Sequence, residues 1–310
     1  MMRFLLRRAA GMVATLFATS LLTYLLLFLG DGDPAAVIVA RRTGVMPSAA
    51  QIAQVRAQYG LDRPVIMQYA AWLGQVVRGD FGYSIRTGQP VLVEIGARLG
   101  TTLALAGLTM GVTVGLGLAI GLIAAFYEGS RFDQVTRLLA LIGVAVPNFW
   151  LAFLLILLFA VYLHWLPSHG VSQPTSVILP VVTLACANVA TLSQLTRSLL
   201  RTVRHQDFVR TARAKGLSTR TTWLRHALPN VSAPLLTLVA SQFANIATGA
   251  VIIETIFAWP GIGNFYLLAV SFRDIPVIQA MVLLFAAIFV GINFLVDLAY
   301  AWFDPRIRLA

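Results

Sequence analysis

Long stretches of the sequence contain no Asp, Glu, Lys or Arg, and the first three of these are residues 9–30, 99–127 and 138–196. A helix of roughly 20 apolar residues crosses the hydrocarbon core of a bilayer, because each residue adds about 1.5 Å. The first two stretches each hold one such helix, and the third is long enough for two. Apolar runs of this length are not expected in a soluble protein, whereas helices that cross a bilayer require them. We therefore predict an all-α polytopic membrane protein.

Charge is scarce and unbalanced. Charged residues make up 11% of the 310 residues, hydrophobic ones 58%, and the net charge is +11, with Lys215 the one lysine. A basic chain can bind nucleic acid, but here the basic residues lie at the ends of apolar runs, where topology signals are found. We therefore expect a lipid bilayer as partner and no nucleic acid. With the single cysteine, Cys186, an intrachain disulfide is excluded and no metal site is predicted.

Six membrane-spanning helices account for the apolar runs. They are expected at residues 9–30, 99–127, two within 138–196 (one opening at Pro147, one containing Pro180), 231–253 and 277–302. The first is longer than a typical signal-peptide core and is expected to be retained. Basic residues gather near the start of the chain and in residues 197–229, so the N-terminus, the C-terminus and that loop are expected in the cytoplasm. The predicted location is the cell inner (plasma) membrane, crossed several times.

Three regions follow from this pattern. Residues 1–30 are the N-terminal tip with the first span, residues 31–98 an outer (periplasmic) segment, and residues 99–310 a core with five spans and the loop 197–229. In the outer segment, Ser48 and Gln51 form a capping box, which predicts short amphipathic helices there. In the second span Gly107, Gly111 and Gly115 recur every four residues, and Gly117 and Gly121 form another such pair. This spacing predicts a close approach of two helices, either within the chain or between subunits.

Residues 197–229 are a polar loop between two apolar halves, with eight basic residues and one acid, Asp207. Phe208, Val209 and Ala212 share a face at helical spacing. Gly216 suits the left-handed conformation that ends a helix, and Ser218 or Thr219 can cap a second one. The loop is predicted to be two short helices joined by a tight turn.

This loop resembles the cytoplasmic signature of the membrane subunits of ATP-binding-cassette (ABC) importers, which reads Glu-Ala-Ala, three residues, Gly, nine residues, Ile-x-Leu-Pro. Four positions match at that spacing: Ala212, Gly216, Leu228 and Pro229. Three differ, with Arg210, Thr211 and His226 in place of the Glu, the first Ala and the Ile. These replacements fit the peptide and nickel branch, whose loops resemble Asp-Tyr-x-Arg-Thr-Ala-Arg-Ala-Lys-Gly-Leu. Residues 60–82, 254–263, 273–279 and 304–308 are also similar to that branch.

The resemblance implies the fold of a type I ABC importer permease and the function of a permease subunit for peptides of the dipeptide and oligopeptide class. It implies four kinds of partner or ligand: a second homologous permease subunit, two ATPase subunits, ATP and Mg on those ATPases, and an extracytoplasmic substrate-binding protein. The chain contains no Gly-x-x-x-x-Gly-Lys-Ser/Thr loop, so we expect it to bind no cofactor and to be no enzyme.

Two sets of site residues are predicted. The ATPase-coupling set comprises Asp207, Phe208, Val209, Arg210, Ala212, Arg213, Lys215, Gly216, Leu217, Leu228 and Pro229. Within it, an apolar contact with the ATPase is expected at Phe208, Val209, Ala212 and Leu217, with the arginines as its rim. Candidates for lining the substrate pathway are polar residues in the spans: Asn188, Gln194, Gln242, Asn245, Glu254 and Asn293. For Asn188 and Gln194 the alternative role is helix–helix hydrogen bonding, and for Glu254 it is an interfacial salt bridge, with Arg273 as the candidate partner.

Other functions remain open at this stage. Within the same family, the substrate could be a nickel chelate or glutathione. Outside it, an ion-coupled secondary carrier would need no ATPase, and an intramembrane hydrolase would need a nucleophile and a base facing each other inside the membrane. All four histidines lie outside the predicted spans or at their edges, which disfavours the hydrolase.

Overall fold

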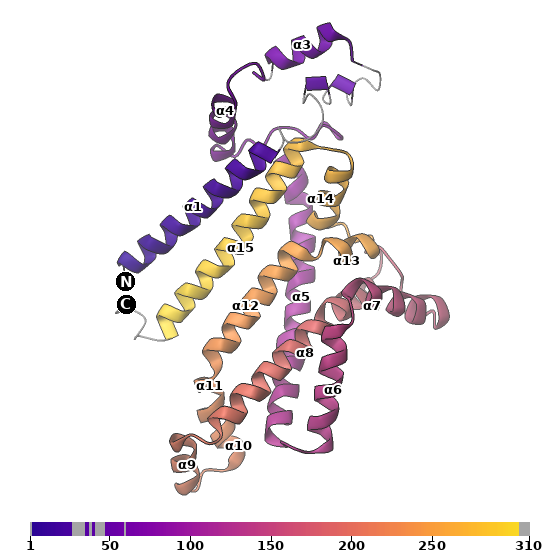
Figure 1. Ribbon diagram of the computed structural model, residues 1–310. Coiled ribbons are helices and arrows are strands. Elements are labelled where there is room, and N and C mark those ends of the chain that lie inside the picture. Colours follow the sequence, from indigo (N-terminus) through magenta and orange to yellow (C-terminus); the bar gives the residue numbers. More distant parts are fainter. Residues whose placement is uncertain (1, 27–34, 37–38, 41–46, 59, 304–310) are drawn as a thin grey trace. The chain divides into compact units, whose positions relative to one another are not determined.

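The computed structural model describes residues 2–26, 35–36, 39–40, 47–58 and 60–303 (Figure 1). In this part of the chain the secondary structure is helical, and the one β-type pairing is an isolated bridge between Tyr83 and Pro90. The prediction of an all-α protein is therefore confirmed. Residues 304–308, which resemble the peptide and nickel branch, lie outside the described residues.

Four helices are long and apolar enough to cross a bilayer. They fall at Leu6–Leu25 within α1 (Met2–Leu26), in α5 (Val91–Phe126), at Pro174–Val203 (η2, Pro174–Val177, followed by α8, Ile178–Val203) and at Ile275–Leu298 within α15 (Ile275–Phe303). Two bent pairs of helices also pass the same test, which gives up to 6 spans if each bent pair is one span. The four-to-six range includes the predicted six.

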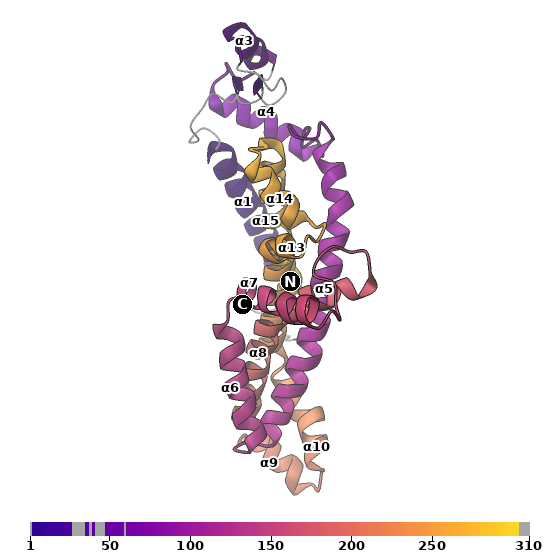
Figure 2. The ribbon, with the colours of Figure 1, turned by 90° about the vertical axis from the view of Figure 1, so that its right-hand side faces the viewer.

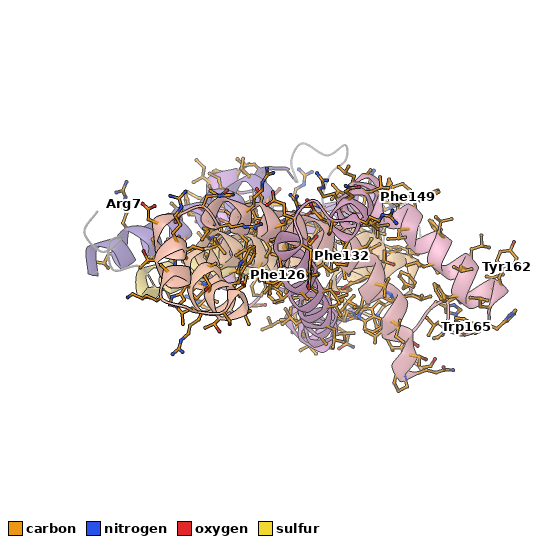
Figure 3. All side chains as sticks on the ribbon, turned by 90° about the horizontal axis from the view of Figure 1, so that it is seen from below. Arg7, Phe126, Phe132, Phe149, Tyr162 and Trp165 are labelled. Atoms are coloured by element: carbon orange, nitrogen blue, oxygen red, sulfur yellow. The ribbon has the colours of Figure 1, made fainter. Side chains whose placement is uncertain are left out.

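The first bent pair joins α6 (Arg131–Ala145) to α7 (Asn148–Leu155) and its π-helical continuation η1 (Ile156–Tyr162), with a bend of 102°. Pro147 causes the break, because a proline disfavours helical backbone at the preceding residue, and Val146 is extended, with φ −78° and ψ 122°. The sequence correctly predicted a helix opening after Pro147. It missed the separate helix α6 that comes before it. Phe149 and Tyr162 are labelled on the two ends of α7–η1 in Figure 3.

The second bent pair joins Thr222–Asn230 to α12 (Ser232–Gly249), with a bend of 65°. Val231 leaves the helical conformation, with φ −107° and ψ 5°. Pro234 explains the break, because its ring would clash with the carbonyl group four residues earlier, that of Asn230. A short helix, α13 (Val251–Ile256), follows α12.

The chain divides into two compact units. Unit 1 comprises residues 1–100 and 264–290, and unit 2 residues 101–263 and 291–310. Unit 1 contains α1, α3 (Ala49–Gln58), α4 (Val65–Val77), most of α14 (Ile262–Ser271) and the first half of α15. The predicted capping box is present at the start of α3, where the Gln51 amide donates to Ser48 Oγ at 3.3 Å and the Ser48 amide donates to Gln51 Oε1 at 3.0 Å.

In unit 2, α6 packs against α8 (Figure 2), and α5 approaches α8 closely at two glycines. Two glycines of α5 set the distance to α8. A Cβ atom on Gly117 would approach the Leu192 side chain to 2.9 Å, and one on Gly121 would approach the Ser193 carbonyl oxygen to 2.6 Å. The predicted close approach is therefore confirmed for this glycine pair, and it occurs within the chain. At Gly107, Gly111 and Gly115 a Cβ would meet no atom of the described chain within 4 Å, so no helix of this chain approaches closely there.

Candidate functional site

Residues 197–203 of the loop continue α8, and residues 207–229 fold as two short helices joined by a tight turn, as the sequence predicted. The first, α9 (Asp207–Ala214), is followed by Gly216 at φ +80°, where the Leu217 amide donates to the Ala212 carbonyl at 3.3 Å. A Cβ on Gly216 would meet no atom within 4 Å, so glycine is required by the backbone angle, which other residues adopt at a cost.

The second helical stretch begins at Ser218. Its hydroxyl accepts from the Thr221 amide at 3.2 Å, the N-cap geometry that the sequence predicted. The stretch continues through α10 (Thr219–Thr221), the π-helical turn η3 (Thr222–Ala227) and α11 (Leu228–Asn230). Leu228 and Pro229, the end of the matched signature, therefore lie in the last turn before the bend at Val231.

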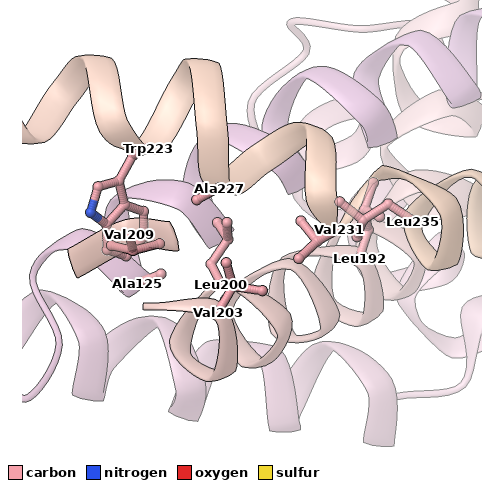
Figure 4. Packing of buried hydrophobic residues seen from close by; sticks show 9 residues of the cluster. All are labelled: Ala125, Leu192, Leu200, Val203, Val209, Trp223, Ala227, Val231 and Leu235. Carbon is pink, nitrogen blue, oxygen red and sulfur yellow. The ribbon is translucent and has the colours of Figure 1, made fainter. Parts of the chain in front are cut away.

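The apolar face of α9 is directed into the chain. Val209 is 1% exposed and Ala212 is also buried. Val209 packs in a cluster with Leu200 and Val203 of α8 and with Trp223 and Ala227 of η3 (Figure 4), and Phe208 packs against this cluster while partly buried. The prediction that Val209 and Ala212 contact an ATPase is therefore wrong for this conformation, because the contacts that fold the loop already cover both side chains.

Trp223 fixes the loop to the end of α5. Its side chain is 4% exposed, and its ring meets that of Phe126 edge-on, with centroids 5.8 Å apart. Phe126 is the last residue of α5, and Ala125 beside it belongs to the same buried cluster. The two short helices are thus held against two longer helices of unit 2, α5 and α8.

Three arginines near the end of α8 pair with two acidic residues, one in the turn between α5 and α6 and one in the first turn of α6. Arg197 binds Asp133 with two hydrogen bonds, of which Nη2 to Oδ2 measures 2.9 Å, and the Asp133 side chain is 1% exposed. Arg201 and Arg204 both pair with Glu128, at 2.7 Å and 3.4 Å. These ion pairs connect the base of the loop to the start of α6. The sequence indicated these arginines only as topology signals.

The outward surface of the loop carries basic and apolar side chains together. It includes the exposed residues Asp207, Arg210, Lys215, Leu217, Leu224, Arg225 and Pro229. Asp207 and Arg210 are 3.8 Å apart and largely in solvent, so that pair contributes little to stability. Arg213 lies on α9, and its side chain is outside the described part of the structure. A surface of this composition suits a docking contact, with Leu217 and Leu224 as its apolar points.

The candidate pathway residues lie in different environments. Gln242 is buried and its Nε2 donates to the Asn188 carbonyl at 3.2 Å, while the Asn188 amide side chain donates to the Leu184 carbonyl at 2.7 Å. Gln194 is half-buried, and Asn245 and Asn293 are exposed. In this conformation Gln242 therefore forms a hydrogen bond from α12 to α8.

Glu254 on α13 is fully buried. Its carboxylate accepts from Thr102 Oγ1 at 2.6 Å and from the Gly263 amide at 2.8 Å, and the Ile262 amide donates to the same Thr102 hydroxyl at 2.9 Å. A Cβ on Gly261 would overlap the carboxylate. The prediction that Glu254 lines an open pathway is wrong for this conformation, because the loop after α13 closes over it.

Within the described residues, no group of three or more His, Cys, Asp and Glu side chains could hold a metal ion. The site combines an anchored loop, whose exposed side chains are basic and apolar, with polar groups within apolar helices.

Comparison with known proteins identifies the family. Residues 117–309 match the family described as binding-protein-dependent transport system inner membrane component, and residues 1–106 match the N-terminal region of such membrane components. A probable peptide ABC transporter permease, y4tP of Sinorhizobium fredii, is 38% identical over 313 residues, which are 98% of this chain and 99% of that protein. The glutathione transport system permease GsiC of Escherichia coli K12 is 38% identical over 308 residues, 99% of each chain.

Solved structures agree on the fold. A chain of the inward-facing MetNI methionine ABC transporter aligns with a TM-score of 0.57 at 14% identity, covering 68% of this chain and 96% of that chain. A chain of an amino acid ABC transporter aligns with a TM-score of 0.51 at 15% identity, covering 66% and 92%. With both family regions and full-length relatives in agreement, this chain belongs to the family of binding-protein-dependent transport system inner-membrane components and is an ABC transporter permease.

Proposed function

We propose that this permease imports peptides of the dipeptide and oligopeptide class, using ATP hydrolysed on two separate ATPase subunits that hold ATP and Mg. The substrate would arrive on an extracytoplasmic binding protein, and a second homologous permease subunit would complete the pathway. The proposal is supported by the full-length relative that is named a probable peptide ABC transporter permease. It is also supported by the loop 197–229, whose outward surface is free while its inward face is anchored.

The proposed topology has six spans, with each bent helix pair counted as one span. The protein would lie in the cell inner membrane, with the N-terminus, the C-terminus and the loop 197–229 on the cytoplasmic side. The eight basic residues of the loop support that side, since Lys and Arg accumulate in cytoplasmic loops. Residues 31–98 would then be extracytoplasmic, residues 1–30 the tip with the first span, and residues 99–310 the permease core.

The loop would transmit movement as a rigid body. An ATPase that grips Arg210, Lys215 and Leu217 would pull on α9, and α9 would carry α8 and the end of α5 with it, because Val209 and Trp223 are buried against those helices. Rigid-body displacement of packed helices is a common way in which a small local movement becomes an opening elsewhere. In this way ATP-driven movement of the ATPases would alternate the pathway between inward-open and outward-open states.

The pathway itself would be lined by the polar groups that the fold leaves accessible: Asn188, Gln194, Asn245 and Asn293. Asn245 carries the strongest case. Its side chain is exposed on α12, and in the described structure its amide has no hydrogen-bond partner. An unsatisfied amide facing hydrocarbon is costly, so this face of α12 would look onto water or onto another subunit.

Glutathione is the second candidate substrate, because GsiC, a glutathione transport system permease, is as similar to this chain as the peptide permeases are. A nickel chelate has only the branch-level sequence resemblance in its favour. An ion-coupled carrier or an intramembrane hydrolase would not account for the family membership.

Uptake in proteoliposomes tests the proposal. The permease pair, the ATPases and the binding protein are reconstituted, and labelled dipeptides, oligopeptides, glutathione and a nickel chelate are supplied outside. We expect peptide uptake that requires both ATP and the binding protein. Uptake driven by an ion gradient without the ATPases, or no uptake of peptides or glutathione, would contradict it.

A further inference from the structure

Three buried polar groups lack a hydrogen-bond partner within the part of unit 2 that the structure describes. They are the hydroxyls of Thr109 and Thr113 on α5 and the side-chain carbonyl of Gln242 on α12. Both threonines are 0% exposed and Gln242 is 6% exposed. Gln242 is engaged through its Nε2, which donates to the Asn188 carbonyl of α8, so its Oε1 remains to be explained.

Other buried threonines form the bond that these two lack. A helical threonine commonly donates its hydroxyl to the carbonyl four residues earlier, and this bond is present at 2.7–3.0 Å for Thr23, Thr183, Thr196 and Thr222. Thr109 and Thr113 lie in the interior of α5 and form no such bond. A buried hydroxyl without a partner costs free energy, because it has exchanged water for an environment with no acceptor. Packing alone therefore does not account for hydroxyls at these two positions.

The two threonines lie on the stripe of α5 that approaches α8. Residues four apart are neighbours on a helix surface, and the same four-residue step leads from Thr109 and Thr113 to Gly117. An added Cβ on Gly117 would come within 2.9 Å of Leu192, and the contact continues along both helices in the same direction. One step before this contact, Thr113 is therefore level with Asn188, whose carbonyl receives the bond from α12.

Neutral polar groups from α5, α8 and α12 are thus grouped within about two helical turns. No Asp, Glu, Lys or Arg occurs in residues 99–127, 138–196 or 231–253, so these segments add no charge to the group. Hydroxyl and amide groups can bond to N–H and C=O groups, and every peptide carries both in its backbone. A neutral site that binds backbone groups would accept peptides with different side chains.

The group also adjoins the proposed pathway. Gln242 is three residues from Asn245, the exposed residue of α12 proposed above to face the pathway, and residues three apart are neighbours on a helix. We infer that Thr109, Thr113 and Gln242 bind the backbone of the transported peptide in the state in which the pathway is open along α5 and α12. The inference rests on the proposed function of peptide import and assigns specific residues to it.

Thiol accessibility tests whether these positions open during transport. In a Cys186→Ser background, Thr113→Cys replaces the hydroxyl with a thiol of similar size, and a water-soluble maleimide is added to the reconstituted transporter at rest and during ATP-driven uptake of labelled dialanine. We expect Thr113→Cys to react at least about fivefold faster during uptake, because thiols react only when they are accessible. Thr196→Cys, at a position that is also 0% exposed, is the matched control and should stay unreactive in both conditions. A Thr113→Cys reaction rate that is the same at rest and during uptake would overturn the inference.

Removing the hydroxyls separates substrate binding from packing. Thr109→Val and Thr113→Val keep the shape of the side chain and remove an unpartnered hydroxyl, so the Tm should be unchanged or higher. Uptake of dialanine at saturating loaded binding protein should fall about fivefold for each variant, the effect of one lost hydrogen bond to the peptide. Thr196→Val is the control, because its hydroxyl already donates to the Leu192 carbonyl, and its uptake should stay within about twofold of the wild type.

Two results would contradict the site itself. Normal uptake by both valine variants would show that the hydroxyls do not contact the peptide, and a lower Tm would show that they bond within the fold. Either result leaves peptide import by the wild type intact. A wild-type transporter that imports no peptide would instead contradict the proposed function, and this inference with it.

Discussion

Removing the Trp223 side chain should uncouple ATP hydrolysis from transport. Trp223 is 4% exposed and joins the loop to Phe126 at the end of α5. Trp→Ala substitutions in well-packed sites cost about 3–5 kcal/mol, and the aromatic pair contributes about 0.5–1.5 kcal/mol beyond its buried area. A loss of stability of this size is enough to detach the two short helices of the loop from α5 and α8, while the membrane-spanning helices keep their own contacts.

The assay compares ATP hydrolysis with uptake in the reconstituted transporter. For Trp223→Ala we expect normal amounts of protein in the membrane and continued ATP hydrolysis, with uptake at least about tenfold lower, the equivalent of about 1.4 kcal/mol of lost coupling. Trp223→Phe is the matched control, because it keeps a ring against Phe126 and should retain most of the uptake. If Trp223→Ala transports within about twofold of the wild type, the loop does not transmit movement through this contact.

Three further predictions concern single residues. Gly216→Ala places a side chain at φ +80°, so the folded loop should be destabilised by about 1–2 kcal/mol. The effect would be detected as faster proteolysis within residues 207–221, and unchanged proteolysis would show that the turn tolerates a Cβ. Asp133→Asn leaves Arg197 without its buried counter-charge and should destabilise the protein by about 3–5 kcal/mol, seen as a lower Tm, whereas a Tm equal to the wild type would mean that the pair is dispensable. Glu254→Leu leaves the Thr102 hydroxyl and a backbone amide without an acceptor, which should cost about 2–5 kcal/mol; normal thermal stability would contradict the buried arrangement around Glu254.

Local features of the loop could be predicted from the sequence. Gly216 and Ser218 act through their own backbone and side-chain geometry within a few residues, so their roles could be predicted from the sequence. The same holds for the helix break at Pro147, which follows from a clash with its neighbour. The apolar face of α9 was also correctly recognised.

What that face contacts could not be predicted. Val209 packs against Leu200 and Trp223, and Trp223 meets Phe126, nearly a hundred residues earlier. Such pairings depend on how whole helices pack, and an apolar face alone does not tell an interior contact from an exposed one. The inward direction of Val209 and Ala212 was missed for this reason.

The environment of Glu254 had a partial signal in the sequence. Gly261 and Gly263 follow the acid closely, and both are positions where a Cβ would collide with its carboxylate. Two glycines spaced in this way indicate a close backbone approach. The third partner, Thr102, is far away in the sequence and only the fold brings it to the carboxylate.

Site-directed cross-linking of the loop to the ATPase subunit tests the central claim most directly. In a background with Cys186 replaced by Ser, single cysteines are introduced at Leu217, which is 38% exposed, and at Val209, which is 1% exposed, and the assembled transporter is treated with a short bifunctional thiol reagent. We predict strong cross-links to the ATPase from Leu217→Cys and none from Val209→Cys. The absence of cross-links from Leu217→Cys, or equal cross-linking from both positions, would contradict an ATPase docked on the outward surface of this loop.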